Sequence, residues 1–469
     1  MPRPNVILIT ADQWRGDCLG CAGHDNVKTP YIDSLATQGI LYTNAYSATP
    51  TCIPARAALH TGMSQKHHGR VGYQDGVRWD YPHTMAGELS DAGYITKCVG
   101  KMHVHPLRNS LGFHDIELHD GYLHYYRNAA KPIYEDQRFA DDYIYWLKGE
   151  LGINADVTDT GIECNSWVAR PWNYEERLHP TNWVTDRAID FFRRRDHDKP
   201  FFLNISYVRP HPPFDAPQCF FDMYRDMEIT PPLMGDWADT DRRDNSGTFY
   251  ASETGPKDLE LIRQAQIGYY ACMTHIDYQI GRILEAVGSY GLTGNTVIIF
   301  TSDHGEMMCD HALYRKSLPY KGSANIPLII SGAGIGRGVS DKLTELRDIM
   351  PTVLTIADTK IPSGVDGIDI LSDSVIEYIH GEHLNGAKSN HFIVTQADKY
   401  IWFSQSGREQ YFNLAADPNE LHNAVNDGEY RERISTLRTH LIAELTDRPE
   451  GYVSDNTLIS GRPTRAVLL

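Results

Sequence analysis

The run from Thr49 to Gly62 combines a cysteine, a proline and an arginine in a specific spacing. Cys52, Pro54 and Arg56 follow the pattern Cys-x-Pro-x-Arg and lead into an alanine-rich stretch that predicts a helix. Cysteine is a residue type that can act as a nucleophile. On these residues alone, however, a buried cysteine at a turn is favoured, since cysteine is often a small core residue and short motifs arise by chance.

Two acidic residues follow two separate apolar runs that have the character of buried strands. Asp12 comes after residues 6–10 and Asp303 after residues 296–301, with Gln13 and His304 as their neighbours. Carboxylates clustered at strand ends are the oxygen ligands that a hard divalent cation needs. Either aspartate alone would more often be a helix cap, but the two together predict a metal site.

Basic and imidazole side chains occur at further strand ends and on a stiff loop. Lys101 and His103, two residues apart at a strand end, would point to one side and could bind an oxyanion and move a proton. His211 lies between prolines, on a loop that suits a positioned acid. The alternatives are a solvated lysine, an incidental member of the 21 histidines and a turn residue.

Short apolar runs alternate with helical patterns along most of the chain. Strands are predicted at 6–10, 94–99, 201–207, 296–301 and 327–330, and helices at 84–91, 183–194, 259–287 and 346–357. This alternation predicts an α/β fold in which a large, mostly parallel or mixed sheet is sandwiched by helices. Ligands of such folds bind beyond the carboxyl ends of the strands, where Asp12 and Asp303 lie.

The pattern changes after residue 351. Residues 361–367 are typical of a turn-rich linker. Strand-like runs at 391–396, 400–405 and 410–414 and a helix from about 430 to 445 follow it. We therefore expect a catalytic α/β domain at residues 1–365 and a smaller C-terminal α+β subdomain at 366–469. In the latter, Glu382 and His383 are candidates for substrate binding, with a structural turn as the alternative.

Charge and composition restrict the partners. The 44 Lys and Arg residues against 61 Asp and Glu residues give a net charge of −17, which opposes binding to nucleic acid or anionic membranes. An anionic substrate would need a local basic pocket. The eight cysteines show neither a disulfide framework nor zinc-site spacing, so reduced thiols are expected. Without a signal peptide or a bilayer-spanning run, the chain is expected to be cytoplasmic, with no membrane partner.

Several blocks together resemble the type I sulfatases, the formylglycine-dependent, arylsulfatase-like members of the alkaline phosphatase superfamily. The blocks are the Cys-x-Pro-x-Arg run, Gly93–His103 with its final Gly-Lys-Met-His, Ser206–Phe214 with Pro-His-Pro-Pro-Phe, Asp303–Gly322 and Arg408–Asn423. The resemblance implies an alkaline-phosphatase-like fold. It also implies that a formylglycine-generating enzyme oxidises Cys52 to formylglycine, whose hydrate is the nucleophile.

The resemblance assigns roles to the basic residues. It implies that Arg56, Lys101 and Lys316 offset charge on the sulfuryl oxygens. It implies further that His211 protonates the leaving oxygen and that His103 takes the proton whose removal expels sulfate.

A metal ion, usually calcium, is implied by the same resemblance. Its ligands would be Asp12, Gln13, Asp303, His304 and residue 52. Many relatives carry a second aspartate where Gln13 stands and an asparagine where His304 stands. Because an amide and an imidazole lower the charge and hardness of the ligand set, magnesium, manganese or zinc are alternatives.

Hydrolysis of a small anionic sulfate ester, such as a sulfated mono- or oligosaccharide, with release of inorganic sulfate, is thus the predicted function. A phosphonate monoester hydrolase or phosphodiesterase of the same superfamily is the alternative, because Asp-Gln after the first strand is frequent there. The Gly-Lys-Met-His block favours the sulfatase. A noncatalytic protein that binds sulfated glycans is less consistent, since binding alone does not require a formylglycine motif.

Overall fold

The computed structural model describes residues 3–121, 140–155, 164–239, 255 and 258–468. Its centre is an eight-stranded sheet with the order β5-β4-β6-β1-β7-β8-β2-β9. The strands are β1 (Asn5–Asp12), β2 (Gly39–Tyr42), β4 (Ile95–Gly100), β5 (Asp115–Leu118), β6 (Phe201–Pro210), β7 (Thr296–Thr301), β8 (Leu328–Gly332) and β9 (Gly338–Ser340). Within this sheet β8 alone runs opposite to the others, so the sheet is mostly parallel.

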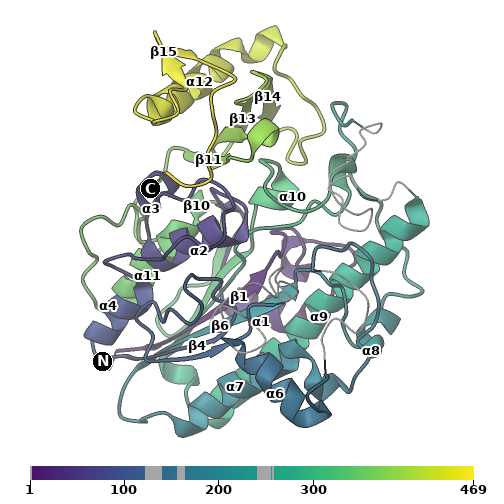
Figure 1. Ribbon diagram of the computed structural model, residues 1–469, viewed down its shortest axis with the longest axis vertical. Helices are drawn as coiled ribbons and strands as arrows, with labels where there is room; N and C mark the ends of the chain where they lie inside the picture. The colour runs from purple at the N-terminus through teal and green to yellow at the C-terminus, as the bar shows by residue number, and fades with distance from the viewer. Residues whose placement is uncertain (1–2, 122–139, 156–163, 240–254, 256–257, 469) are drawn as a thin grey trace.

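Helices cover both faces of the sheet because its central strand is apolar on both sides (Figure 1). Val6 and Leu8 of β1 pack in one core and Ile7 and Ile9 in the other, as alternation along a strand requires. The first core contains α2 (Cys52–Thr61), α4 (Met85–Asp91) and α11 (Ile349–Ile356). The second contains α1 (Pro30–Gln38), α6 (Asp142–Leu151), α7 (Pro180–Arg194) and α9 (Leu259–Ser289).

A second, antiparallel sheet follows near the C-terminus, at the top of Figure 1. Its strands are β11 (Ile379–His383), β12 (Asn390–Val394), β13 (Asp398–Phe403) and β14 (Glu409–Asn413), in that order. The helix α12 (Arg431–Leu445) packs on it, with Leu437 and Leu441 against Tyr400 and Trp402. These elements confirm the predicted α+β character, whereas the division at residue 365 stays a prediction.

The end of the chain returns to the large sheet's side of the molecule. Ala466 O accepts hydrogen bonds from Val71 N at 2.9 Å and Gly72 N at 3.0 Å, and Leu468 N donates to Gly69 O at 2.7 Å. Figure 1 shows this end beside α3 (Gln65–His68). Position 72 itself requires glycine, because a Cβ there would lie 2.3 Å from the Leu384 carbonyl oxygen.

The sequence-based expectations for the fold agree with the structure in the core. All five predicted strands of the large sheet are present. The eight cysteines all lie within the described ranges and are free thiols. Across those ranges no helix is long and apolar enough to cross a membrane.

The central strand should dominate the stability of this fold. Leu8 is fully buried, so Leu8→Ala should lower the free energy of unfolding by about 2–5 kcal/mol through lost burial and a residual cavity. Leu259→Ala, the matched change at a side chain that is 74% exposed, should change it by less than about 0.5 kcal/mol. Urea titration followed by circular dichroism measures both, and equal losses would contradict this account of the core.

Candidate active site

Four neighbouring parallel strands end at one edge of the sheet, and each carries predicted site residues there. Lys101 and His103 follow β4, and His211 follows β6. Asp12 is the last residue of β1, and Asp303 comes shortly after β7. The sheet order β4-β6-β1-β7 therefore brings together residues that lie far apart in the sequence.

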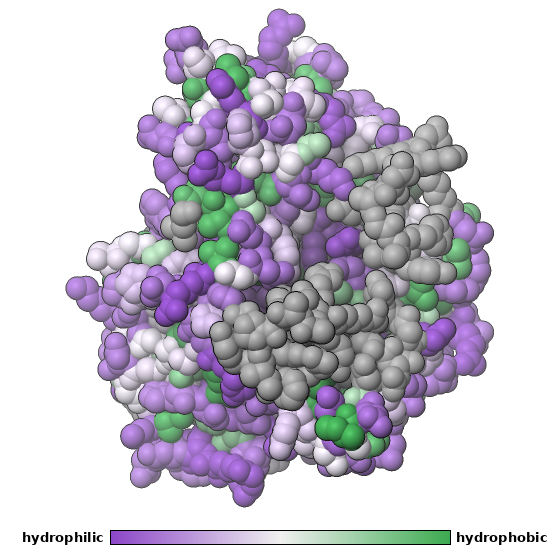
Figure 2. Space-filling view, in the orientation of Figure 1, coloured by the Kyte–Doolittle hydropathy of each residue, from purple (hydrophilic) through white to green (hydrophobic). Residues whose placement is uncertain are grey.

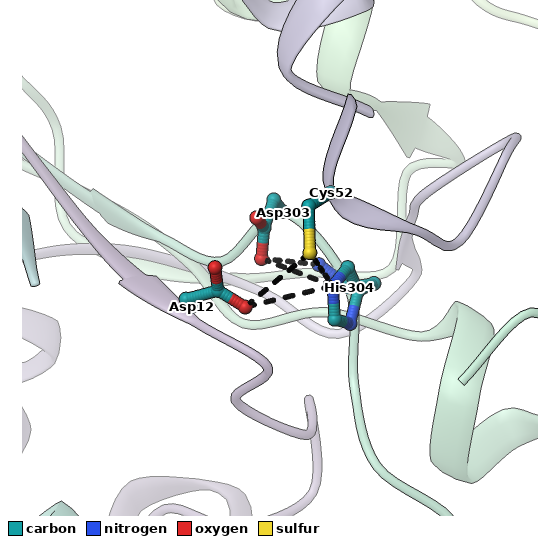
Figure 3. A group of neighbouring side chains, drawn as sticks. All are labelled: Asp12, Cys52, Asp303 and His304. Atoms are coloured by element: carbon teal, nitrogen blue, oxygen red, sulfur yellow. Dashed lines mark hydrogen bonds and ion pairs between the residues drawn. The ribbon is translucent and has the colours of Figure 1, made fainter. Parts of the chain in front are cut away.

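Four of the predicted metal ligands form one buried cluster. Figure 3 shows Asp12, Cys52, Asp303 and His304 pointing toward one another. One potential ligand atom from each lies within 4.8 Å of the others. The Cys52 Sγ is 3.2 Å from His304 Nε2 and 3.9 Å from Asp12 Oδ1. The first residue of α2 thus meets the ends of β1 and β7.

The chemistry of this cluster suits a divalent cation. His304 Nδ1 donates to Gly305 O at 3.0 Å, which leaves the Nε2 lone pair directed at the cluster. The pKa of Asp303 is raised, because burial and the neighbouring Asp12 carboxylate disfavour a second negative charge. A cation would offset that repulsion, and two carboxylates with one imidazole form an acceptable ligand set.

Two fully buried cations hold the carboxylates of the cluster. Arg56 Nε donates to Asp303 Oδ2 at 3.0 Å, and its Nη1 donates to Lys101 O at 2.8 Å. Lys101 Nζ donates to Asp12. Burial alone would raise the pKa of Asp12, but Lys101, with further contributions from the neighbouring histidines and Lys316, holds it well below its usual range.

Arg56 and Lys101 were expected to offset charge on the sulfuryl oxygens, and that role stays a prediction. Each side chain is only 1% exposed, and neither lines the adjoining cavity. Their positive charges act on the cluster through Asp12 and Asp303, because ion pairing is what makes buried carboxylates tolerable.

A cavity of about 210 Å³ opens beside the cluster. Cys52, His103, His211 and Lys316 all line it, so four predicted catalytic residues meet there. Lys316 Nζ lies 3.5 Å from Cys52 Sγ and donates to Gln13 Oε1 at 2.6 Å. Lys316 is thus the lysine whose charge faces both residue 52 and the cavity.

Gln13 lies at the edge of the cluster and is firmly oriented. Its φ is 69°, and its backbone N–H donates to Asp303 Oδ1 at 3.1 Å. The side-chain nitrogen donates to Glu306, which directs the amide oxygen toward Lys316. Its role as a ligand stays a prediction. No pattern marked Glu306 in advance beyond its place in the Asp-His-Gly-Glu block.

Opposing electrostatic effects act on two side chains that line the cavity, the Cys52 thiol and the His211 imidazole. Burial and Asp12 would raise the pKa of the Cys52 thiol, but Lys101 and Lys316, with His304, outweigh them and hold it well below its usual value. Burial and Lys316 hold the pKa of His211 well below its usual range. A bound sulfate ester would oppose that shift through its negative charge.

The backbone at His103 is held in an unusual conformation. Its φ is 57°, in the left-handed region that non-glycine residues seldom adopt. Asp120 Oδ1 accepts from Met102 N at 2.8 Å and from His103 N at 2.9 Å, which stabilises this turn. Such strain concentrates at functional sites. No local pattern in the sequence identified Asp120.

The two predicted substrate-binding residues of β11, Glu382 and His383, differ in what they contact. His383 lines the cavity, and its buried Nε2 has no hydrogen-bond partner among the described residues. Glu382 was predicted wrongly: it is fully buried, and Arg448 Nη1 donates to its carboxylate at 2.7 Å. Adjacent residues of a strand face opposite ways, so only one of the two could reach the cavity.

Fold and site together define a class of protein. A buried cluster of potential metal ligands includes Cys52, and a lysine and two histidines line the cavity beside it. Such a site is suited to cleaving anionic esters. The sequence profile of the Sulfatase family matches residues 4–359. The chain therefore belongs to the sulfatase family. That family implies a metal ion and formylglycine, and the cluster around residue 52 fits both.

The comparisons with individual proteins agree. The chain is 51% identical to an arylsulfatase of Clostridium perfringens, over 98% of each chain. It is a sulfuric ester hydrolase.

Solved structures share the fold. The phosphonate monoester hydrolase of Agrobacterium radiobacter has a TM-score of 0.78 at 25% identity and covers 98% of this chain and 100% of its own. A protein solved with its substrate D-glucosamine-2-N,6-O-disulfate has a TM-score of 0.73 at 19% identity and covers 95% and 98%. The arylsulfatase relative and the family match favour the sulfatase over the phosphonate hydrolase.

Metal binding should depend on Asp12. Asp12→Asn removes one charged ligand while keeping its shape, so the metal content per chain after dialysis should fall about tenfold or more. Asp80→Asn, at a side chain that is 88% exposed, should leave the content unchanged. Elemental analysis by mass spectrometry measures both variants, and an unchanged content in Asp12→Asn would contradict the assignment.

Proposed function

We propose that this protein hydrolyses sulfate esters of small sugars, with formylglycine at position 52 and a calcium ion at the cluster. The observation that carries the proposal is the position of Cys52. It belongs to the cluster of potential metal ligands and also lines the cavity next to Lys316, His103 and His211. In this structure the Cys52 Sγ stands in for the oxygen of the modified side chain.

Formylglycine as its hydrate supplies a hydroxyl nucleophile, and the metal ion supplies a Lewis acid. The chain's own residues do the rest. Lys316 binds the sulfuryl oxygens, because its ammonium group faces the cavity next to residue 52. Arg56 and Lys101 offset negative charge on the carboxylates of the cluster and hold them in place.

The two histidines of the cavity divide the proton transfers. His211 Nδ1 donates to Pro212 O at 2.8 Å, which leaves Nε2 to face the leaving oxygen. Bound sulfate favours the protonated ring, which then donates from Nε2. His103 accepts the proton that residue 52 gives up when sulfate departs.

The size and lining of the cavity support a small sugar sulfate. About 210 Å³ is below the roughly 300–1,000 Å³ of sites for drug-sized ligands. Asn165, Asn385 and the unpartnered His383 Nε2 add polar groups that suit hydroxyls. Figure 2 shows a mainly hydrophilic face on which apolar residues form small separate groups. The disulfated glucosamine bound by one structural neighbour is of this size class.

Paired initial rates test the proposal. The protein is co-expressed with a formylglycine-generating enzyme and assayed on an aryl sulfate and on the matching aryl phosphonate monoester. A strong preference for the sulfate is expected and would justify a screen of sulfated sugars. Preference for the phosphonate would overturn the proposal. Cys52→Ala is the blank, and sulfate release by this variant would exclude residue 52 as the nucleophile.

Chelation and add-back test the calcium assignment. After treatment with a chelator, calcium should restore most of the activity, since two carboxylates and an amide oxygen favour a hard ion. Restoration by manganese or zinc but not by calcium would show that the His304 imidazole selects a softer ion.

His211→Ala should impair poor leaving groups most. An alkoxide needs protonation as the ester bond breaks, so turnover of a sugar sulfate should fall by about 100-fold or more. An activated aryl sulfate needs little protonation, so its rate should fall much less. Steady-state kinetics on the two substrates give the comparison, and equal losses would show that His211 is not the acid.

A further inference from the structure

His103 lines two cavities. One is the active-site cavity, which it lines together with Cys52. The other is a small cavity of about 50 Å³, which it lines together with Asp75, Gly76 and Trp79 among others. The proposed reaction uses only the first cavity, so the second one and its carboxylate have no role so far.

Asp75 is the carboxylate that faces the His103 ring from this second cavity. Its Oδ1 lies 3.5 Å from His103 Nε2, and its side chain is 31% exposed. Neither ring nitrogen of His103 makes a hydrogen bond of regular geometry with the described residues. A slightly long contact is common in substrate-free active sites and shortens during the reaction.

Tyr73 orients this carboxylate. Its hydroxyl donates to Asp75 Oδ2 at 2.8 Å, which leaves Oδ1 for the histidine. The Tyr73 ring also lies edge-on to the His103 ring, with centroids 6.0 Å apart, and lines the active-site cavity. Tyr73, Asp75 and His103 thus form a chain of contacts that starts in one cavity and ends in the other.

A second carboxylate, that of Asp120, also lies near the turn at His103. Asp120 Oδ1 accepts hydrogen bonds from the backbone N–H groups of Met102 and His103. Asp75 is therefore the carboxylate placed to act on the His103 ring itself.

We propose that Asp75 is a positioning residue for His103: its Oδ1 accepts a hydrogen bond from Nε2–H and thereby turns Nδ1 toward residue 52. This inference rests on the proposed function. In the step that frees sulfate, an O–H bond at residue 52 breaks and its proton passes to Nδ1. The electron pair of that bond forms the aldehyde C=O, and sulfate departs with the electrons of its bond to carbon.

The second cavity adds a consequence. Asp75 lines the small cavity and not the active-site cavity, and its side chain is 31% exposed, so it gives His103 a route to solvent outside the active-site cavity. Once Nδ1 has taken a proton, the imidazolium can therefore give up its Nε2 proton to water beside Asp75 while the larger cavity is filled. Asp75 acts through His103 and touches neither substrate nor metal, so its removal should slow one step only.

Asp75→Asn tests the proposal, with Asp80→Asn as the matched control on the same loop. The kcat of Asp75→Asn on an aryl sulfate should fall about 10- to 100-fold, the usual effect of losing such a partner. Because the slowed step follows release of the phenol, KM should fall in parallel and kcat/KM should stay within about twofold. Stopped-flow mixing should show a burst of phenol equal to the formylglycine content, which mass spectrometry measures.

A second comparison separates positioning from structural damage. If Asp75 acts through His103, adding Asp75→Asn to His103→Ala should change kcat no further, whereas independent effects would multiply. An unchanged kcat in Asp75→Asn would overturn the proposal. So would a parallel loss of kcat/KM, since that places the defect at or before ester cleavage.

Failure of this proposal and failure of the proposed function are distinguishable. The wild type and Asp80→Asn report which ester is hydrolysed, the sulfate or the phosphonate. Asp75→Asn is then measured on whichever substrate the wild type prefers, because the release step passes through the same residue 52 in both. The ratio of the variant to the wild type decides on Asp75 alone.

Discussion

The ionised carboxylate of Asp12, fully buried at the end of the central strand, is the constraint that organises the rest of the structure. A buried charge without partners would be prohibitive. Lys101 after β4 and Arg56 on α2 supply opposite charges, and His304 after β7 lies 3.6 Å away. The Asp12 carbonyl also accepts from His211 N at 3.0 Å. One residue thereby connects all four strand ends and the helix that carries residue 52.

The backbone around Asp12 shows how the sheet is adapted to this task. The register between β1 and β6 shifts between Ala11 and Asp12, so Asp12 pairs with Pro210. Such an irregularity redirects a side chain at the end of a strand. Gln13 then takes a positive φ, and the chain turns away from the sheet. The regular part of β1 is held rigidly in the sheet, and the irregularity at its end directs the Asp12 side chain into the cluster.

Sequence patterns predicted the parts of this architecture that depend on burial and missed those that depend on tertiary contact. The central strands are continuous apolar runs, which is what a doubly covered parallel sheet requires. The short strands β5 and β9 lack such runs, and β2 has only three apolar residues, Ile40, Leu41 and Tyr42. Asp12 and Asp303 were found because they follow such runs directly. Asp75 and Asp120 lie in loops, where no periodicity in the sequence marks them. Glu382 was misjudged because the sequence does not show which of two adjacent strand residues, Glu382 or His383, faces the cavity.

The hydrogen bonds between the end of the chain and residues 69–72 give the C-terminus an architectural role. Residues 69–72 lead directly into Tyr73 and Asp75, and Leu384 N, next to His383, donates to Val71 O at 2.8 Å. Residues 466–468 therefore support one wall of the active-site cavity. In engineering terms, a fusion partner joined there would be anchored to that wall, whereas one joined ahead of β1 would enter at the opposite rim of the sheet.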